Sequence, residues 1–268
     1  MPELPEVEAV CRKLRVVEGA RIVQMRFERP SIAKPQSAAK IAERVAGTVI
    51  RQVERRGKNI LLWLDSGEAI HIHLRMTGNL TVVPDVRFRI TSGRAWMELE
   101  GGRGIIYEDP RALGKIHLLT AKEVDTKLAD VGIEPLSDAF TFEYWKEQTA
   151  RSAKPSKLFL MDQKFVAGLG NIYAAEALFR AGIHPAKSLK GLHRPKLQAL
   201  YDAIRQVLAE AMDSAVAAYA EPDRFAEGEV FDCAVYGREG EPCIRCGRKV
   251  KRIPQGGRST YFCSGCQK

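Results

Sequence analysis

CIRCGRKVKRIPQGGRSTYFCSGC, residues 243–266, holds four of the six cysteines of this 268-residue chain. They form two Cys-x2-Cys pairs about 16 residues apart, which is the spacing of a four-cysteine zinc site. The residues between the pairs predict a two-stranded ribbon with Gly256 and Gly257 at its turn. Four thiolates complete a tetrahedron and leave no position for water, so we expect one structural Zn²⁺. The predicted ligands are Cys243, Cys246, Cys263 and Cys266.

The same four cysteines are also compatible with two other roles. A disulfide framework is one alternative, and a redox or catalytic zinc is another. A cytosolic setting and paired knuckles favour the structural metal over disulfides. Cys11 and Cys233 have no evident partner in the sequence, and we expect them to be ordinary buried thiols.

Positive charge is concentrated around the predicted ribbon. The formal net charge is +9, from 42 basic and 33 acidic residues. Residues 243–268 contain seven Lys or Arg and no Asp or Glu. A second basic cluster, residues 51–58, lies far away in sequence and includes Lys58. This pattern indicates a polyanionic partner, most commonly nucleic acid, with a solvated basic tail as the alternative interpretation.

The overall composition is that of a soluble globular protein, with 45% hydrophobic and 28% charged residues. No run of about 18 apolar residues predicts a transmembrane helix. The N-terminus carries glutamates where a signal peptide would carry basic residues. We therefore expect no membrane association and a cytoplasmic location.

Periodicity predicts an α+β fold in three regions. Short β-rich runs from Gly19 to Leu119 predict a β-sandwich or barrel. Thr120 and Glu123 then form a capping box that opens a short helix. Helical spacing marks three later segments, 141–152, 171–183 and 193–212. The predicted domains are 1–130 (helix and β-sandwich), 131–232 (helical) and 233–268 (zinc ribbon).

The N-terminal stretch MPELPEVEAV, residues 1–10, supports two compatible interpretations. In one, Pro5 opens a helix with Glu6 in its first turn. In the other, removal of Met1 leaves Pro2 as a free secondary amine. The pKa of an α-amino group is about 7.7–8.0, so a fraction of the molecules carries an unprotonated amine at neutral pH. Attack of this amine on a sugar C1′ would give a cationic iminium, which favours strand cleavage by elimination, with Glu3 and Glu6 moving protons.

Two predicted turns end β-rich runs, HLRMTG at 73–78 and EDPRALGK at 108–115. They place Met76, Arg111 and Leu113 as an apolar, cationic and apolar set that can wedge into a base stack. Core packing of the two apolar residues is the other interpretation, and spacing alone favours it.

A glycine-rich turn at 166–170 leads into a predicted helix that Asn171 could cap. Its backbone amides suit a phosphate, but a plain connection between helices is the more frequent explanation of such a turn. His71 and His73 are interpreted as core or surface histidines, because no third metal ligand is evident nearby.

Together these stretches resemble the formamidopyrimidine-DNA glycosylase and endonuclease VIII family of base-excision repair enzymes. Leu4 in PELPE favours the formamidopyrimidine-DNA glycosylase branch, because the other branch usually has glycine there. The resemblance implies a β-sandwich, a helix–two-turn–helix domain and a zinc ribbon, with DNA bound between the halves. The motifs that carry it are PELPEVE (2–8), RRGK (55–58), HLRMTG (73–78), DPR (109–111), KLFLMDQKFVAGLGNIYAAEALF (157–179), VYGREGEPC (235–243) and GRSTYFCSGCQK (257–268).

The resemblance also assigns roles. Pro2 is the Schiff-base nucleophile, Glu3 the general acid and base, and Glu6 supports the site. Lys58 contacts DNA and the damaged nucleotide, and Arg258 serves both the phosphate grip and the second elimination. The residues that it assigns to DNA binding are Met76, Arg94, Arg111, Leu113, Lys157, Asn171 and Arg258.

The implied activity is that of a bifunctional DNA glycosylase and AP lyase. It would remove oxidised purines, formamidopyrimidines first and 8-oxoguanine as a further candidate, and cleave the strand by β,δ-elimination. Its partner would be double-stranded DNA with damaged bases or abasic sites, bound by a monomer in the bacterial cytoplasm or nucleoid. The alternatives are an endonuclease VIII-like enzyme for oxidised pyrimidines and a non-catalytic protein that binds damaged DNA.

Three departures from the branch pattern concern lesion choice. Leu113 stands where phenylalanine is common, and Arg94 stands at the place of a DNA-contacting histidine. The segment 215–238 is shorter than the loop that covers a flipped purine in that branch. These departures bear on 8-oxoguanine recognition more than on the lyase chemistry.

Overall fold

The computed structural model describes residues 1–86, 93–219 and 231–268. The chain falls into two units, Met1–Ala129 with Ala215–Glu227, and Asp130–Ser214 with Gly228–Lys268. Each unit has its own hydrophobic core. The predicted α+β fold, with an N-terminal β-sandwich, a helical region and a zinc ribbon, is confirmed.

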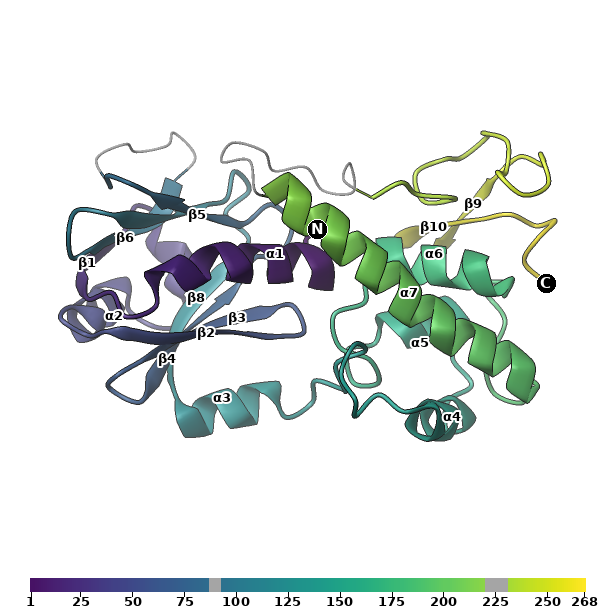
Figure 1. Ribbon diagram of the computed structural model, residues 1–268, viewed down its shortest axis with the longest axis horizontal. Helices are drawn as coiled ribbons and strands as arrows, with labels where there is room; N and C mark the ends of the chain where they lie inside the picture. Colours follow the sequence, from purple (N-terminus) through teal and green to yellow (C-terminus); the bar gives the residue numbers. More distant parts are fainter. Residues whose placement is uncertain (87–92, 220–230) are drawn as a thin grey trace. The chain divides into compact units, whose positions relative to one another are not determined.

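The described part of the first unit contains two four-stranded antiparallel sheets (Figure 1). Side chains from the strands of both sheets share one core. The first sheet has the order β1-β6-β7-β5, with β1 Ile22–Phe27, β6 Gly93–Leu99, β7 Gly104–Glu108 and β5 Asn79–Val83. The second has the order β2-β3-β4-β8, with β2 Ile50–Arg56, β3 Asn59–Leu64, β4 Glu68–His73 and β8 Lys115–Thr120.

Helix α1 (Leu4–Leu14) runs between the two sheets (Figure 1). It contacts β5 of the first sheet and β2 and β3 of the second. Nine of its eleven residues are buried, because the helix has apolar neighbours on both sides. The shorter helices of this unit are η1 Arg15–Val17, η2 Pro30–Ala33, α2 Ala38–Val45 and α3 Ala121–Leu128.

The start of α3 is as predicted, and helix α2 was not predicted. Thr120 and Glu123 form the predicted capping box of α3. Helix α2, capped by Ser37, interrupts a stretch that the sequence indicated to be β-rich. It forms because Ile41 and Val45 share one buried face, a short helical repeat inside a region dominated by strand patterns.

Glu8 carries a buried charge on α1. Its carboxylate accepts hydrogen bonds from Arg55 at 2.9 Å, Arg12 at 3.2 Å and Arg15 at 3.3 Å. Burial alone would raise the pKa of Glu8, but the hydrogen bond and charge of Arg55, with Arg12 and Arg15, outweigh burial and hold the pKa below its ordinary value. Arg55 lies on β2, so this pair joins the helix to the second sheet.

The second unit is built around aromatic residues. Trp145 is fully buried and donates from Nε1 to the Leu197 carbonyl at 3.1 Å. Phe140 and Phe159 pack against the Trp145 ring. The helices that supply this core are α4 Phe142–Ala150, α5 Ser156–Met161, α6 Asn171–Ala181 and α7 Arg194–Tyr219. Among the described residues, no helix is long and apolar enough to cross a membrane.

The predicted ribbon is present in the second unit. Strands β9 (Lys251–Gln255) and β10 (Arg258–Phe262) pair antiparallel, with Gln255 opposite Arg258. Gly256 and Gly257 form the turn with φ of 57° and 72°, a conformation that glycine adopts at little cost. Upstream of the ribbon, the buried Glu176 of α6 accepts hydrogen bonds from the backbone amides of residues 234–236.

We predict that Glu8→Gln lowers the free energy of unfolding at pH 7 by about 1.5–3 kcal/mol, because it removes the charge from buried hydrogen bonds. A depressed pKa means that the carboxylate stabilises the fold above its ordinary pKa of about 4.3 and loses this effect as the pH falls through the folded-state value. The difference between variant and wild type should therefore shrink at pH 3. Denaturant melts at both pH values measure it.

Glu43→Gln on the exposed face of α2 is the matched control and should change little at either pH. An equal loss of stability at both pH values in Glu8→Gln would show that the ionised carboxylate is not what stabilises α1.

Candidate functional site

The N-terminus leads directly into the buried end of α1. Glu3 is the N-cap residue, and Glu3 and Glu6 form a capping box in which the Glu3 amide donates to Glu6 Oε2 at 2.8 Å. Both carboxylates are 1% exposed, and Pro2 is also buried. Pro5 lies in the first turn, as the helix-start interpretation predicted. Pro2 therefore immediately precedes a helix end whose backbone is fixed by two acidic side chains.

Lys58 lies in the two-residue loop between β2 and β3 and is 8% exposed. Gly57, the other loop residue, has a φ of 57°. Arg55 donates to the Gly57 carbonyl at 3.1 Å while its Nε binds Glu8. One guanidinium thus holds both the Lys58 turn and helix α1, a link between residues 47 positions apart that no local pattern indicates.

The predicted wedge residues lie at the tips of two loops, one within residues 73–78 and the other within residues 108–115. These are called the wedge loops below. Met76 is 36% and Leu113 is 43% exposed, and Arg111 is exposed as well. Core packing, which spacing alone favoured for the two apolar residues, is therefore wrong. Neighbouring residues in both loops, Arg75 and Ala112, have φ values of 59° and 50°. Such left-handed conformations are unusual for residues other than glycine and require support from their surroundings.

Arg94 binds the backbone of one of these loops. Its Nε donates to the Asp109 carbonyl at 2.7 Å and its Nη2 to the Pro110 carbonyl at 3.0 Å. The resemblance assigned Arg94 to DNA contact, whereas these two donors are engaged within the protein.

Asn171 is the first residue of α6, and Gly170 occupies the N-cap position. The expectation that Asn171 caps this helix is therefore wrong. Its side chain instead donates from Nδ2 to the Ser259 carbonyl of β10 at 3.1 Å. The preceding turn has Gly168 at a φ of 82° and is held by Gln163, whose Oε1 accepts from the Gly168 amide at 2.9 Å.

Lys157 is fully buried on α5. Its Nζ donates to the Ser259 carbonyl at 2.9 Å and to Thr260 Oγ1 at 2.7 Å. The resemblance assigned Lys157 to direct DNA contact, but this ammonium group lies inside the second unit and binds the β10 strand.

These contacts bring three predicted residues together. Asn171 and Lys157 both donate to the carbonyl of Ser259, the residue that follows Arg258. Arg258 itself is exposed at the start of β10. An exposed cation thus stands on a strand that α5 and α6 hold at the adjacent residue.

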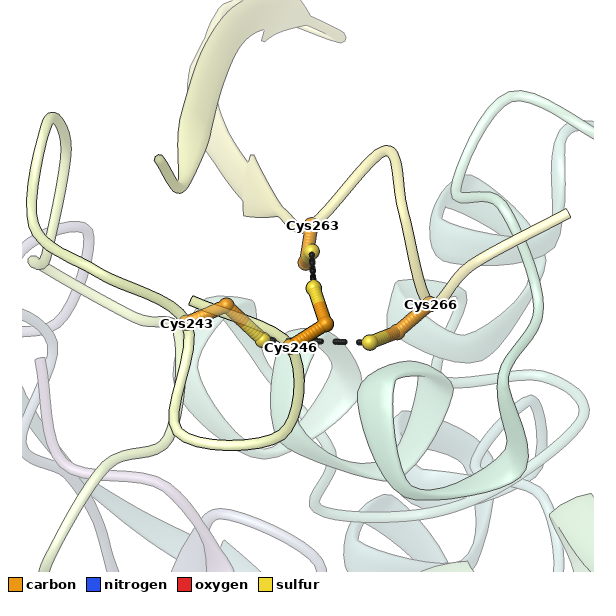
Figure 2. A group of neighbouring side chains, drawn as sticks. All are labelled: Cys243, Cys246, Cys263 and Cys266. Carbon is orange, nitrogen blue, oxygen red and sulfur yellow. Dashed lines mark hydrogen bonds between the residues drawn. The ribbon is translucent and has the colours of Figure 1, made fainter. Parts of the chain in front are cut away.

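The four predicted zinc ligands lie together, with their side chains directed toward a common centre (Figure 2). All four sulfur atoms lie within 4.8 Å of one another. The Sγ–Sγ distance is 3.8 Å between Cys243 and Cys266 and 3.5 Å between Cys246 and Cys263. A tetrahedral ion with Zn–S bonds of about 2.3 Å requires sulfur separations of about 3.8 Å, whereas a disulfide requires about 2.05 Å. The cysteines are free and fit one Zn²⁺.

Asp109 is a site residue that the sequence reasoning missed. It belongs to the DPR motif, but only Arg111 was singled out there. Asp109 is fully buried, and its side chain accepts hydrogen bonds from three residues of the wedge loops and β7. The available signal was an acidic residue two positions after the apolar run GIIY (104–107), at the start of a predicted turn. The shortened segment 215–238, which was expected to cover a flipped base, falls largely on residues 220–230, outside the described residues.

Three family models match successive parts of the chain. The formamidopyrimidine-DNA glycosylase N-terminal domain matches residues 1–116, and the formamidopyrimidine-DNA glycosylase H2TH domain matches 131–220. The zinc finger found in FPG and IleRS matches 240–268.

Full-length relatives agree with these models. The formamidopyrimidine-DNA glycosylase of Gluconobacter oxydans is 39% identical over 284 residues, covering all of both chains. That of Thermus thermophilus is 39% identical over 277 residues, covering all of this chain and 98% of the relative.

Solved structures show the same likeness. Lactococcus lactis Fpg in complex with FAPY-dG-containing DNA is 30% identical, with a TM-score of 0.89 over 99% of this chain and all of that one. Its complex with abasic-site DNA has a TM-score of 0.90 over 99% of both chains. The resemblance inferred from the sequence is confirmed: the chain belongs to the formamidopyrimidine-DNA glycosylase family of base-excision repair enzymes.

Proposed function

We propose that this chain binds double-stranded DNA containing a damaged base, releases that base and cleaves the strand, with Pro2 as the nucleophile. The observation that carries the proposal is the placement of Pro2, buried and directly before the Glu3–Glu6 capping box at the fixed end of α1. An amine attached to a rigid helix end is oriented before substrate arrives, which lowers the entropic cost of reaching the reacting carbon.

The chemistry follows from the amine. Once Met1 is removed, the Pro2 nitrogen carries a lone pair that forms a bond to C1′. The electron pair of the bond between C1′ and the base leaves with the base, which takes up a proton. The attached nitrogen loses its proton, and the bond between C1′ and the ring oxygen O4′ then breaks, with O4′ taking up a proton, to leave an open-chain iminium. This cation acidifies C2′, so loss of a C2′ proton expels the 3′ phosphate, and a second elimination, after loss of a C4′ proton, expels the 5′ phosphate. Glu3 supplies and removes protons, since its carboxylate adjoins Pro2 in the chain.

Glu6 and Lys58 act around this centre. Glu6 accepts from the Glu3 amide and so holds the residue next to the nucleophile. Lys58 presents a cation from a turn that Arg55 ties to α1 through Glu8. We propose that Lys58 contacts the damaged nucleotide and the adjacent backbone.

The DNA grip belongs to the second unit. Arg258 is exposed, so its guanidinium is free to meet a phosphate, and Asn171 opens the helix whose N-terminal amides favour negative charge. Lys157 is a positioning residue here, because its buried ammonium acts on the backbone of β10. Zn²⁺, when bound to the four cysteines, stabilises a ribbon that buries few apolar side chains of its own.

The wedge residues and the relatives favour oxidised purines as the substrate class. Met76, Arg111 and Leu113 form an exposed set suited to filling the gap left by an extruded nucleotide. The matched Lactococcus lactis structures contain DNA with FAPY-dG or an abasic site. Leu113 lacks an aromatic face, which weakens base stacking and keeps an endonuclease VIII-like preference as the second candidate. Acting on chromosomal DNA, the protein would work in the bacterial cytoplasm or nucleoid.

The test of the activity is incision of matched duplexes that contain a formamidopyrimidine, 8-oxoguanine or thymine glycol. We expect the formamidopyrimidine duplex to be cut fastest. Glu3→Gln should slow base release by about 10²–10⁴-fold, the usual contribution of general acid–base catalysis. Glu100→Gln, an exposed glutamate of the same unit, is the control and should cut at the wild-type rate. Faster cleavage of thymine glycol would assign the chain to the pyrimidine class instead.

The phosphate grip is tested by the salt dependence of DNA binding. Arg258→Ala should make the plot of log affinity against log salt shallower by about 0.9, the effect of losing one phosphate contact. Lys157→Met should weaken binding as well, yet add little to Arg258→Ala, because Lys157 acts by positioning the Arg258 strand. Lys122→Ala on exposed α3 is the control for loss of one positive charge. Additive losses with a further shallowing of the slope would mean that Lys157 contacts a phosphate directly.

A further inference from the structure

The buried carboxylate of Asp109 lies where the two wedge loops meet. We infer that Asp109 is a positioning residue that holds the Met76 loop and the Arg111–Leu113 loop as one unit, so that the wedge enters the base stack as a single rigid element. The inference rests on the proposed function, because it assigns a task to residues that act only when DNA is bound.

The side-chain oxygens of Asp109 accept hydrogen bonds from both loops. Oδ1 accepts from Thr77 Oγ1, in the residue directly after Met76. Oδ2 accepts from the Gly114 amide at 2.7 Å, in the residue directly after Leu113. Tyr107 on β7 donates its hydroxyl to the same Oδ2 at 3.1 Å. One carboxylate, fully buried, therefore binds the immediate neighbours of both apolar tips.

Further hydrogen bonds, several of them from the backbone, complete this joint between the Met76 loop and the Arg111–Leu113 loop. The Arg111 amide donates to Thr77 Oγ1 at 3.4 Å, so the two loops also touch directly. The Asp109 carbonyl accepts from the Ala112 amide at 3.0 Å and from Arg94 Nε at 2.7 Å. These bonds support Ala112 in its left-handed conformation between Arg111 and Leu113. Such a conformation persists only where the surrounding structure fixes it.

The packing around Tyr107 leaves no room for a looser arrangement. A Cβ atom at Gly114 would lie 1.6 Å from the Tyr107 hydroxyl oxygen, and one at Gly78 would lie 2.6 Å from it. Both loops therefore approach the same hydroxyl through glycine backbone. Burial, followed by the charge and hydrogen bond of Asp109, raises the pKa of Tyr107 above its ordinary value, so the hydroxyl stays a donor to the carboxylate.

A joint of this kind matters for duplex substrates in particular. When a base is extruded from a duplex, the wedge has to replace the stacking that the extruded base made with its neighbours. A damaged site in single-stranded DNA needs no such replacement. Loosening the joint should therefore slow reaction at a base-paired lesion and leave reaction at a single-stranded abasic site nearly unchanged.

Two conservative variants test this without removing the buried charge. Thr77→Val and Tyr107→Phe each delete one hydroxyl donor to Asp109 and nearly keep the side-chain volume. We expect single-turnover excision from a formamidopyrimidine duplex to fall roughly tenfold in each, the size of losing one buried hydrogen bond. Cleavage of an abasic site in a single-stranded oligonucleotide should change less than about twofold. Each effect should be non-additive with Leu113→Ala, because the joint acts through the wedge.

Ile105→Val, a buried core substitution on β7, is the matched control for general destabilisation, and thermal melting of every variant is recorded alongside. Equal losses on duplex and single-stranded substrates, or full additivity with Leu113→Ala, would overturn the inference by showing a merely structural role. Unchanged duplex rates would overturn it as well. A wild-type protein that cleaves neither substrate would instead refute the proposed function.

Discussion

The burial of helix α1 between two sheets is the constraint on which the rest of the first unit depends. A helix with nine buried residues of eleven cannot shift or fray without exposing apolar surface on both sides. Its N-terminal end is therefore held in place, and the side chains of Glu3 and Glu6 accept hydrogen bonds from two backbone amides of the first turn there. The Glu8–Arg55 pair extends the same anchorage to the turn that carries Lys58.

In the second unit, the corresponding constraint is the support of an exposed cation, Arg258, on a small two-stranded ribbon. Arg258 stands at the start of β10, where a two-stranded hairpin alone would be marginally stable. The ribbon is supported near Arg258 by the buried ammonium of Lys157 and the side-chain amide of Asn171, which both donate hydrogen bonds to the Ser259 carbonyl. The four cysteines support it from the other end of the same strand, since Cys263 directly follows β10.

Features encoded by neighbouring residues were predictable from the sequence, and features that depend on tertiary contacts were not. The cysteine spacing, the Gly256-Gly257 turn and the start of α1 are local patterns, and each appears as expected. Lys157 and Arg94 carry the residue types of DNA contacts, but their donors bind carbonyls far away in sequence. Asn171 was expected to cap a helix, and Gly170 takes that position. The three donors to Asp109 come from separate loops and β7, so no spacing rule reveals them.

The proposed chemistry depends on the N-terminal amine of Pro2 as the reacting group. Borohydride reduction of the protein with abasic-site duplex DNA, followed by proteolysis and mass spectrometry of the trapped peptide, tests it most directly. We expect the reduced sugar to be attached to the peptide that begins at Pro2, in chains that have lost Met1. An adduct on a lysine such as Lys58, or no adduct with a protein that still cleaves the site, would contradict it.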